Sequence, residues 1–333
     1  MNRFLLLLIV SLFIWFACES KHNSIKETLY KNTIANNATS LDLDLIQAEE
    51  LFSVGRPHQA IDSINLLIAK KPNWAEPYLI KGNIYMKAGQ YDQAESSFKK
   101  LLNINPQYLS VRFRLGNIAY RKKLFRKAVH YYNKELESGI IKSVDKQITM
   151  LQIGRCYLHL GKIDSALITY NKCMEIDSLY GEALGDMARL HTDNGEYKKA
   201  LRYAKKALSS NQNNIEYLYS LGTIFLKIKE YNQANKYLNL VIDQNPFYEG
   251  AYYNLGQASI RLGNNNLGNK YLAMADSVQK LYTKMENLEL ALDKEPGNYR
   301  NWLALIKLYE SAGMKRKAEQ ALFASQFTKS LKN

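Results

Sequence analysis

Small residues return along this chain at a nearly constant interval. Successive members of one series lie 34, 34, 38, 34 and 34 residues apart, and the series consists of Ala60, Ala94, Ala128, Ala166, Ala200 and Ala234. A second series of small residues runs beside it and consists of Ala48, Gly82, Gly116, Gly154, Ala188, Gly222 and Gly256. A fixed period of this length is typical of stacked helix pairs and not of one globular core. Such arrays usually hold other molecules and seldom catalyse reactions.

Residues 75–108 show what one period contains. Its marked residues occupy positions 4, 8, 11, 15, 17, 20, 24, 27 and 32 and are Tyr78, Gly82, Tyr85, Gly89, Tyr91, Ala94, Phe98, Leu101 and Pro106. Apolar residues recur three and four apart in each half, which predicts two amphipathic helices. Gly89 separates the two halves, and Pro106 ends the second helix. The small residues at positions 8 and 20 allow the two helices to cross closely, and aromatic rings fill the space beside the crossing.

This pattern resembles the tetratricopeptide repeat, which has an aromatic residue at position 4, Leu-Gly at 7 and 8, Tyr at 11, Ala at 20, an aromatic residue at 24, Ala at 27 and Pro at 32. The resemblance implies an all-α fold, a right-handed α-solenoid of about eight helix-turn-helix repeats. We expect the solenoid to span 41–333, with repeats near 41–74, 75–108, 109–146, 147–180, 181–214, 215–248, 249–298 and 299–333. An irregular helical bundle is the alternative, but the period argues against it.

Two departures from the period predict local changes. The repeat that begins at Leu109 is 38 residues long, which adds about one helical turn near Glu137 to Asp145. The gap between Pro246 and Pro296 is 50 residues, which is 16 beyond the period. We therefore expect a long second helix in the seventh repeat, through residues 281–292.

The first 18 residues read MNRFLLLLIVSLFIWFAC and have the layout of a secretory signal. The apolar stretch covers residues 4–16 and is too short for the ~20 residues that a membrane-spanning helix needs. The final Ala-Cys resembles the lipobox of bacterial lipoproteins, which implies cleavage after residue 17 and acylation of Cys18. Trp15 departs from that motif, which usually has Leu, Ile or Val there. Secretion with ordinary cleavage and an uncleaved N-terminal anchor are the two alternatives.

Residues 18–40 are rich in Ser, Asn, Lys and Thr, as expected of a lipidated N-terminus followed by a flexible tether. We therefore expect the array to hang near a bacterial membrane, outer or inner, facing the periplasm. Only Cys156 and Cys173 remain for the folded array, at positions 10 and 27 of one repeat. They are either small buried core residues or a disulfide between paired helices, and the sequence favours the first because cysteine is commonly buried.

The chain is basic, with 45 Lys and Arg against 31 Asp and Glu. Residues 109–142 alone hold nine cations and two carboxylates. A basic patch lies at the turn between the two helices of this repeat and consists of Arg121, Lys122, Lys123, Arg126 and Lys127. It is either a solvated face or a site for an acidic protein, an anionic glycan or lipid headgroups. Nucleic acid is a poor expectation for a secreted chain without a nucleic-acid motif.

The resemblance also implies a partner groove on the first helices, at positions 2, 5, 9, 12 and 13. The residues that we expect to contact a partner there are Asn83, Asn117, Arg155, Arg189, Phe113, Tyr120, Tyr219 and Tyr253. Amide and guanidinium groups beside aromatic rings suit an extended peptide or a partner helix. Some of these rings could instead pack only on their neighbours. The clamp that grips a terminal carboxylate in part of this family requires Lys where this chain has Leu79, so we do not predict that activity.

The sequence does not indicate an enzyme. It lacks HExxH, GxSxG, GxxxxGK[ST] and GxGxxG motifs, and its five histidines are scattered. His159 and His191 fall in adjacent repeats, but isolated helical histidines are more often packed or solvated than metal ligands. We therefore expect no cofactor and no metal.

Two functional hypotheses follow from these features. The first is a membrane-tethered, non-catalytic scaffold or adaptor that binds a protein or peptide partner in the cell envelope. The second is a factor associated with the cell wall or with an anionic glycan, held by the basic patch. The step from array to function is an analogy, because many unrelated functions share this architecture.

Overall fold

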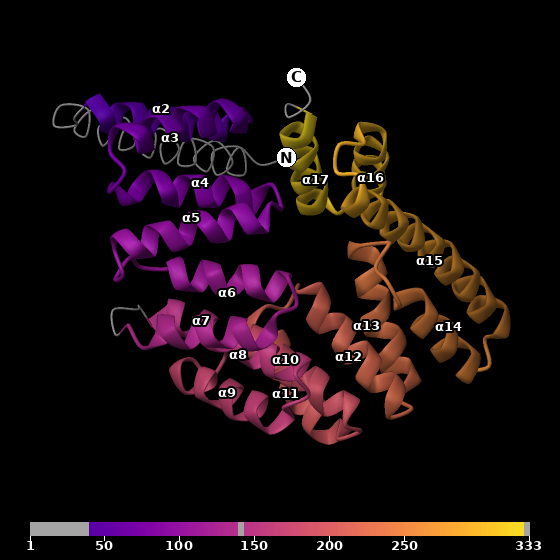
Figure 1. Ribbon diagram of the computed structural model, residues 1–333. Helices are drawn as coiled ribbons and strands as arrows, with labels where there is room; N and C mark the ends of the chain where they lie inside the picture. The colour runs from indigo at the N-terminus through magenta and orange to yellow at the C-terminus, as the bar shows by residue number, and fades with distance from the viewer. Residues whose placement is uncertain (1–39, 139–142, 330–333) are drawn as a thin grey trace, which may run out of the picture. The chain divides into compact units, whose positions relative to one another are not determined.

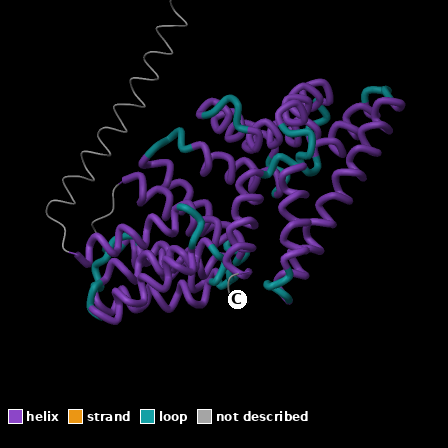
Figure 2. Tube along the Cα trace, turned by 90° about the horizontal axis from the view of Figure 1, so that it is seen from above, coloured by secondary structure: helices purple, strands orange, loops and turns teal. Residues whose placement is uncertain are grey.

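The computed structural model describes residues 40–138 and 143–329. All regular structure within these ranges is α-helical (Figure 2). The predicted signal peptide, Cys18 and nearly all of the predicted tether lie outside the described residues. None of the described helices is both long enough and apolar enough to cross a membrane. The described part of the chain divides into two compact bodies, the first ending at Ile80 and the second beginning at Lys81, and the boundary falls inside one helix.

Sixteen helices in the described ranges follow one another as helix-turn-helix pairs (Figure 1). The first helices of the pairs are α2 (Ser40–Ser53), α4 (Ala75–Lys87), α6 (Val111–Arg121), α8 (Ser143–His159), α10 (Gly181–Asp193), α12 (Ile215–Lys227), α14 (Ala251–Arg261) and α16 (Tyr299–Ser311). The second helices are α3 (Pro57–Lys70), α5 (Tyr91–Ile104), α7 (Phe125–Leu136), α9 (Ile163–Ile176), α11 (Tyr197–Ser210), α13 (Tyr231–Gln244), α15 (Asn265–Lys294) and α17 (Lys315–Lys329). The predicted all-α solenoid of about eight repeats is confirmed.

The two helices of a repeat touch where the first one has glycine. A Cβ atom placed on Gly116 of α6 would lie 2.4 Å from Cε1 of Tyr132 in α7. The same relation holds between Gly82 and Phe98 one repeat earlier, again at 2.4 Å. Phe98 and Tyr132 are fully buried, so their rings have no room to move away. The glycine at position 8 therefore sets how closely the paired helices approach.

The turn between paired helices uses a left-handed residue. Gly89 has φ +75° there, and glycine adopts this conformation without steric cost. Lys123 and Lys229 occupy the equivalent turn position in later repeats, with φ 58° and 67°. Side chains other than glycine pay about 1–2 kcal/mol in this region. The tip of the basic patch is therefore a strained turn.

Both departures from the period appear as longer helices. In the repeat that follows the four-residue insertion, α8 begins at Ser143 and runs for 17 residues, about one turn more than α4 or α10. The extra turn is therefore at the start of α8. The second insertion lies within α15, which is 30 residues long and includes the predicted residues 281–292.

Cys156 and Cys173 are both buried and are not bridged. The Cys173 thiol donates to the backbone oxygen of Gln147 at 3.5 Å. Burial raises the pKa of both thiols to about 12. These residues are part of the core of the fourth repeat, as the burial habit of cysteine predicts.

Candidate functional site

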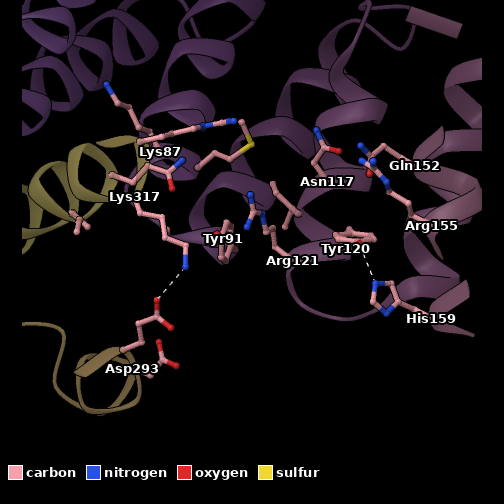
Figure 3. A pocket seen from close by; sticks show the side chains of 18 of the residues that line it. Lys87, Tyr91, Asn117, Tyr120, Arg121, Gln152, Arg155, His159, Asp293 and Lys317 are labelled. Atoms are coloured by element: carbon pink, nitrogen blue, oxygen red, sulfur yellow. Dashed lines mark hydrogen bonds and ion pairs between the residues drawn. The ribbon is translucent and has the colours of Figure 1, made fainter. Parts of the chain in front are cut away.

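An open cavity of about 1680 Å³ lies within the second body and is called here the polar cavity (Figure 3). The first helices α4, α6, α8 and α10 contribute one set of lining residues. Helices α15, α16 and α17 contribute another set. Equivalent positions of successive repeats meet here because each first helix presents the same face to the cavity.

Five of the eight predicted groove residues line the polar cavity, and they are Asn83, Asn117, Tyr120, Arg155 and Arg189. Four of them occupy position 9 of consecutive repeats, so they form a ladder of hydrogen-bonding groups. We call these four residues the position-9 ladder. Figure 3 shows Asn117, Tyr120 and Arg155 around the same space.

The arginines of the ladder contact carboxylates of α10. Arg155 Nε lies 2.7 Å from Asp186 Oδ2, and Arg155 Nη2 lies 3.1 Å from Glu182 Oε2. Arg189 Nη2 lies 3.3 Å from the other oxygen of Asp186. The Asp186 side chain is 10% exposed, so its charge is paired in a largely dry environment. Sequence reasoning missed both carboxylates, although Glu182 occupies position 2, a groove position.

Asn83 begins the ladder, and its side-chain oxygen has no hydrogen-bond donor among the described residues. This Oδ1 atom is also shielded from solvent. A buried acceptor without a donor costs about 1–3 kcal/mol. Asn117, at the next step, accepts a hydrogen bond from Tyr132 Oη at 2.7 Å.

The histidines near the cavity have structural partners. His159 Nε2 lies 2.9 Å from Tyr120 Oη, and the His159 ring stacks on Phe125 with centroids 4.4 Å apart. His191 Nδ1 lies 2.6 Å from Glu196 Oε2. Among residues 40–138 and 143–329, no group of side chains has the composition of a metal site.

The other three predicted groove residues lie elsewhere. Phe113 packs on Tyr132 with ring centroids 5.5 Å apart and does not line the polar cavity. Tyr219 and Tyr253 line a second cavity of about 890 Å³ between α12, α14 and α15, which we call the tyrosine cavity. The predicted groove is therefore divided between two cavities.

The basic patch is partly neutralised by the preceding repeat. Lys122 Nζ lies 2.6 Å from Asp92, and Lys127 Nζ lies 2.7 Å from Glu95. Burial of the Glu95 carboxylate favours its neutral form, but hydrogen bonds from Lys127 and Lys99 outweigh this and lower its pKa to about 2. These lysines therefore join neighbouring repeats.

The remaining three cations of the patch are exposed, namely Arg121, Lys123 and Arg126. None of them forms an ion pair with a described carboxylate. Arg121 lines the polar cavity, whereas Lys123 and Arg126 do not. The five cations therefore differ in role: two form ion pairs with the preceding repeat, one lines the polar cavity and two are exposed outside it.

The contribution of the C-terminal repeat was not predicted. Phe327 of α17 meets Tyr85 of α4 edge to face, with ring centroids 6.1 Å apart. Lys87 Nζ lies 4.5 Å from the centroid of the Phe323 ring. Through these contacts α17 places Arg316, Lys317 and Gln320 in the lining of the polar cavity. No local pattern indicates such contacts, because the residues belong to the first and last repeats of the second body.

Tetratricopeptide repeat family models match residues 75–108, 149–178 and 186–249. The chain therefore contains tetratricopeptide repeats. The human DnaJ homolog subfamily C member 3 is 23% identical over 182 residues, which are 55% of this chain and 32% of that protein. The TPR repeat-containing protein YpiA of Bacillus subtilis is 20% identical over 218 residues, 56% of this chain and 52% of YpiA. The matches thus span about a third and about half of these relatives.

Solved structures share the fold at low sequence identity. PilW, described as a widely conserved type IV pilus biogenesis factor, superposes with a TM-score of 0.54 and 20% identity, covering 64% of this chain and 97% of PilW. A chain of the APC/C hetero-tetramer Cut9-Hcn1 gives a TM-score of 0.55 and 15% identity, covering 74% of this chain and 48% of its own. PilF of Pseudomonas aeruginosa gives a TM-score of 0.52 and 15% identity, covering 62% of this chain and 92% of PilF.

Proposed function

We propose that this tetratricopeptide repeat protein is a non-catalytic scaffold or adaptor that binds a protein or peptide segment in the polar cavity. The position-9 ladder is the observation on which the proposal rests. It places a hydrogen-bonding side chain at the same position of four successive first helices, α4, α6, α8 and α10, all of them in the lining of the polar cavity.

The volume of the cavity and the spacing of the ladder residues along it favour a polypeptide ligand. Its volume of about 1680 Å³ exceeds the ~300–1,000 Å³ of ordinary small-molecule sites. Neighbouring packed helices lie roughly 8–10 Å apart. An extended chain advances roughly 3.3 Å per residue, so about every third residue of a bound segment would meet one step of the ladder. Tyr120 and Leu158 supply apolar surface beside these polar groups.

The proposal places the array at a bacterial membrane, held by a lipid on Cys18 and by the tether of residues 18–40. The N-terminal pattern of one cation, an apolar stretch and Ala-Cys supports this placement. PilW, which shares the fold, is described as a type IV pilus biogenesis factor, and that description agrees with an envelope setting.

Site-specific photo-crosslinking in the native cell tests the scaffold function. A photoreactive residue in place of Gln152, which lines the polar cavity, should capture a specific protein partner. The same residue in place of Lys172, which is exposed on the second helix α9, is the control and should not. Replacing both Asn83 and Asn117 with Ala should reduce the adduct at position 152 at least about fivefold. An equal adduct at 172, or none at 152, would contradict the proposal.

A second proposal, association with an anionic cell-wall polymer, rests on the exposed cations Lys123 and Arg126. Lys123 lies in the turn of the third repeat and Arg126 in the first turn of α7, and neither forms an ion pair with a described carboxylate. Their charge offers a salt-sensitive surface for a polyanion.

A further inference from the structure

The tyrosine cavity differs from the polar cavity in the chemistry of its walls. Its thirteen lining residues include five tyrosines, which are Tyr219, Tyr248, Tyr252, Tyr253 and Tyr282. Every charged lining residue is a carboxylate, and these are Glu216, Glu249 and Asp276. The charged lining is thus purely acidic, although the formal net charge of the chain is +14.

The carboxylates are incompletely neutralised by the described part of the protein. Asp276 pairs with Lys280 one turn along α15, with 2.6 Å between Oδ2 and Nζ. Glu216 accepts a hydrogen bond from Tyr248 Oη at 2.5 Å but forms no ion pair with a described cation. Glu249 is exposed and likewise has no cationic partner among the described residues. The carboxylates of Glu216 and Glu249 are therefore not paired with a cation of the described protein.

The aromatic walls are held in place before any ligand arrives. The rings of Tyr219 and Tyr248 are 4.8 Å apart, and Tyr219 Oη accepts a hydrogen bond from Asn254 at 3.3 Å. Tyr282 Oη donates to the backbone oxygen of Phe247 at 3.2 Å. Gly250, with φ +79°, brings the backbone so close to Tyr219 that a Cβ atom there would lie 2.5 Å from Oη.

One ring of the cavity faces solvent. Tyr253 is 52% exposed, although it sits on α14 between well-packed neighbours. A solvent-facing aromatic ring beside carboxylates has its electron-rich face available to a positive charge. The cavity therefore combines the two attractions that a cation experiences in proteins, to π faces and to carboxylates.

We propose that the tyrosine cavity binds a basic side chain, the guanidinium of arginine or the ammonium of lysine, presented by a protein partner. This inference rests on the proposed scaffold function and adds the chemistry of one contact. A neutral side chain lacks the charge–charge attraction to the carboxylates, and an acidic one is repelled by them. Arginine fits best because its planar group can stack on a ring while its N–H groups reach a carboxylate.

The test uses the purified full chain and the peptide acetyl-Gly-Gly-Arg-Gly-Gly-amide, with binding followed by saturation-transfer NMR. The control peptide has citrulline, which keeps the shape of arginine but has no charge. We expect the arginine peptide to bind at least about fivefold more tightly than the citrulline peptide, in line with the strength of an exposed cation–π contact plus an ion pair. Equal binding of the two peptides would overturn the inference.

Variants locate the binding. Replacing both Glu216 and Glu249 with Gln should weaken the arginine peptide at least about fivefold, and Tyr253→Leu should weaken it about two- to fivefold. Glu230→Gln is the matched control, because Glu230 is exposed at the start of α13 and does not line the cavity. Circular dichroism checks that the variants fold. Unchanged binding in the double variant would show that the peptide binds elsewhere and would refute the site.

The same reagents separate this inference from the scaffold function. The Asn83 and Asn117 substitutions lie in the polar cavity and should leave arginine-peptide binding unchanged. Selective peptide binding without any adduct at position 152 would refute the scaffold function and support the cation site. An adduct at 152 without selectivity for arginine would support the scaffold function and refute the cation site.

Discussion

Arg155 and Asp186 join two consecutive repeats through a contact of 2.7 Å between Nε and Oδ2. Asp186 also accepts from Arg189 and, at 3.4 Å, from Tyr170 Oη. One largely buried carboxylate thus holds both arginines of the position-9 ladder and a core tyrosine. The positions of Arg155 and Arg189 in the polar cavity therefore depend on the carboxylate of Asp186, which also lines the cavity.

Asp186→Asn should lower the free energy of unfolding by about 1–3 kcal/mol. The substitution removes the negative charge that pairs with Arg155, and the loss stays below the ~3–5 kcal/mol of fully buried pairs because the Arg155 side chain is 27% exposed. Urea denaturation measures the change. Asp193→Asn is the control, because Asp193 is exposed on the same helix, and it should cost less than about 0.5 kcal/mol. Equal effects would contradict the role assigned to Asp186.

Gly116→Ala should destabilise the protein by about 1–3 kcal/mol, although alanine is the better helix former. The added Cβ would lie 2.4 Å from a ring atom of the fully buried Tyr132. Thermal or urea unfolding gives the measurement. Arg121→Ala, at the exposed end of the same helix, should change stability by less than about 0.5 kcal/mol. A stabilised Gly116 variant would mean that α6 and α7 are not held at this separation.

Glu95 should make stability depend on pH in the acid range. Its pKa is about 2 in the folded protein and about 4.3 in an unfolded chain. Because the folded pKa is the lower one, the contribution is complete above the unfolded value and is lost as pH falls from about 5 to about 2. The partner lysines are 31–54% exposed, so screening limits it to about 1–2 kcal/mol.

Urea midpoints at pH 7, 4 and 2.5 provide the comparison. Glu95→Gln should be less stable than the wild type at pH 7 and should approach it at pH 2.5. Glu286→Gln, exposed on α15 and without a described ion pair, should track the wild type at every pH. A constant difference between Glu95→Gln and the wild type would exclude titration of Glu95 as the cause.

Lys123 and Arg126 allow the two proposed functions to be compared. Changing both to Gln should shift elution from a heparin column to lower salt, because two unpaired exposed cations are removed. The partner adduct at position 152 should stay within about twofold, since neither residue lines the polar cavity. Loss of the adduct would favour the polymer proposal. Lys122 and Lys127 stay unchanged, because their removal would uncover Asp92 and Glu95.

The sequence by itself determined the features that repeat locally. The spacing of Gly82 and Gly116 predicted the helix crossings, and the insertions predicted the longer α8 and α15. These features can be predicted because each repeat contacts mainly the repeats next to it in the sequence. A 34-residue pattern therefore indicates how neighbouring helices pack. The family resemblance also implied that the residues at position 9 share one face.

Only the tertiary structure decided how those faces combine. Tyr219 and Tyr253 belong to a cavity separate from that of Arg155, and α17 reaches α4 through Phe327. The pairing of Lys122 with Asp92 likewise turned part of a basic patch into a junction between repeats. Such relations depend on the small rotation from each repeat to the next, which accumulates along the array. That rotation is set by the shapes of the packed side chains, so it cannot be predicted from the spacing of residues in the sequence.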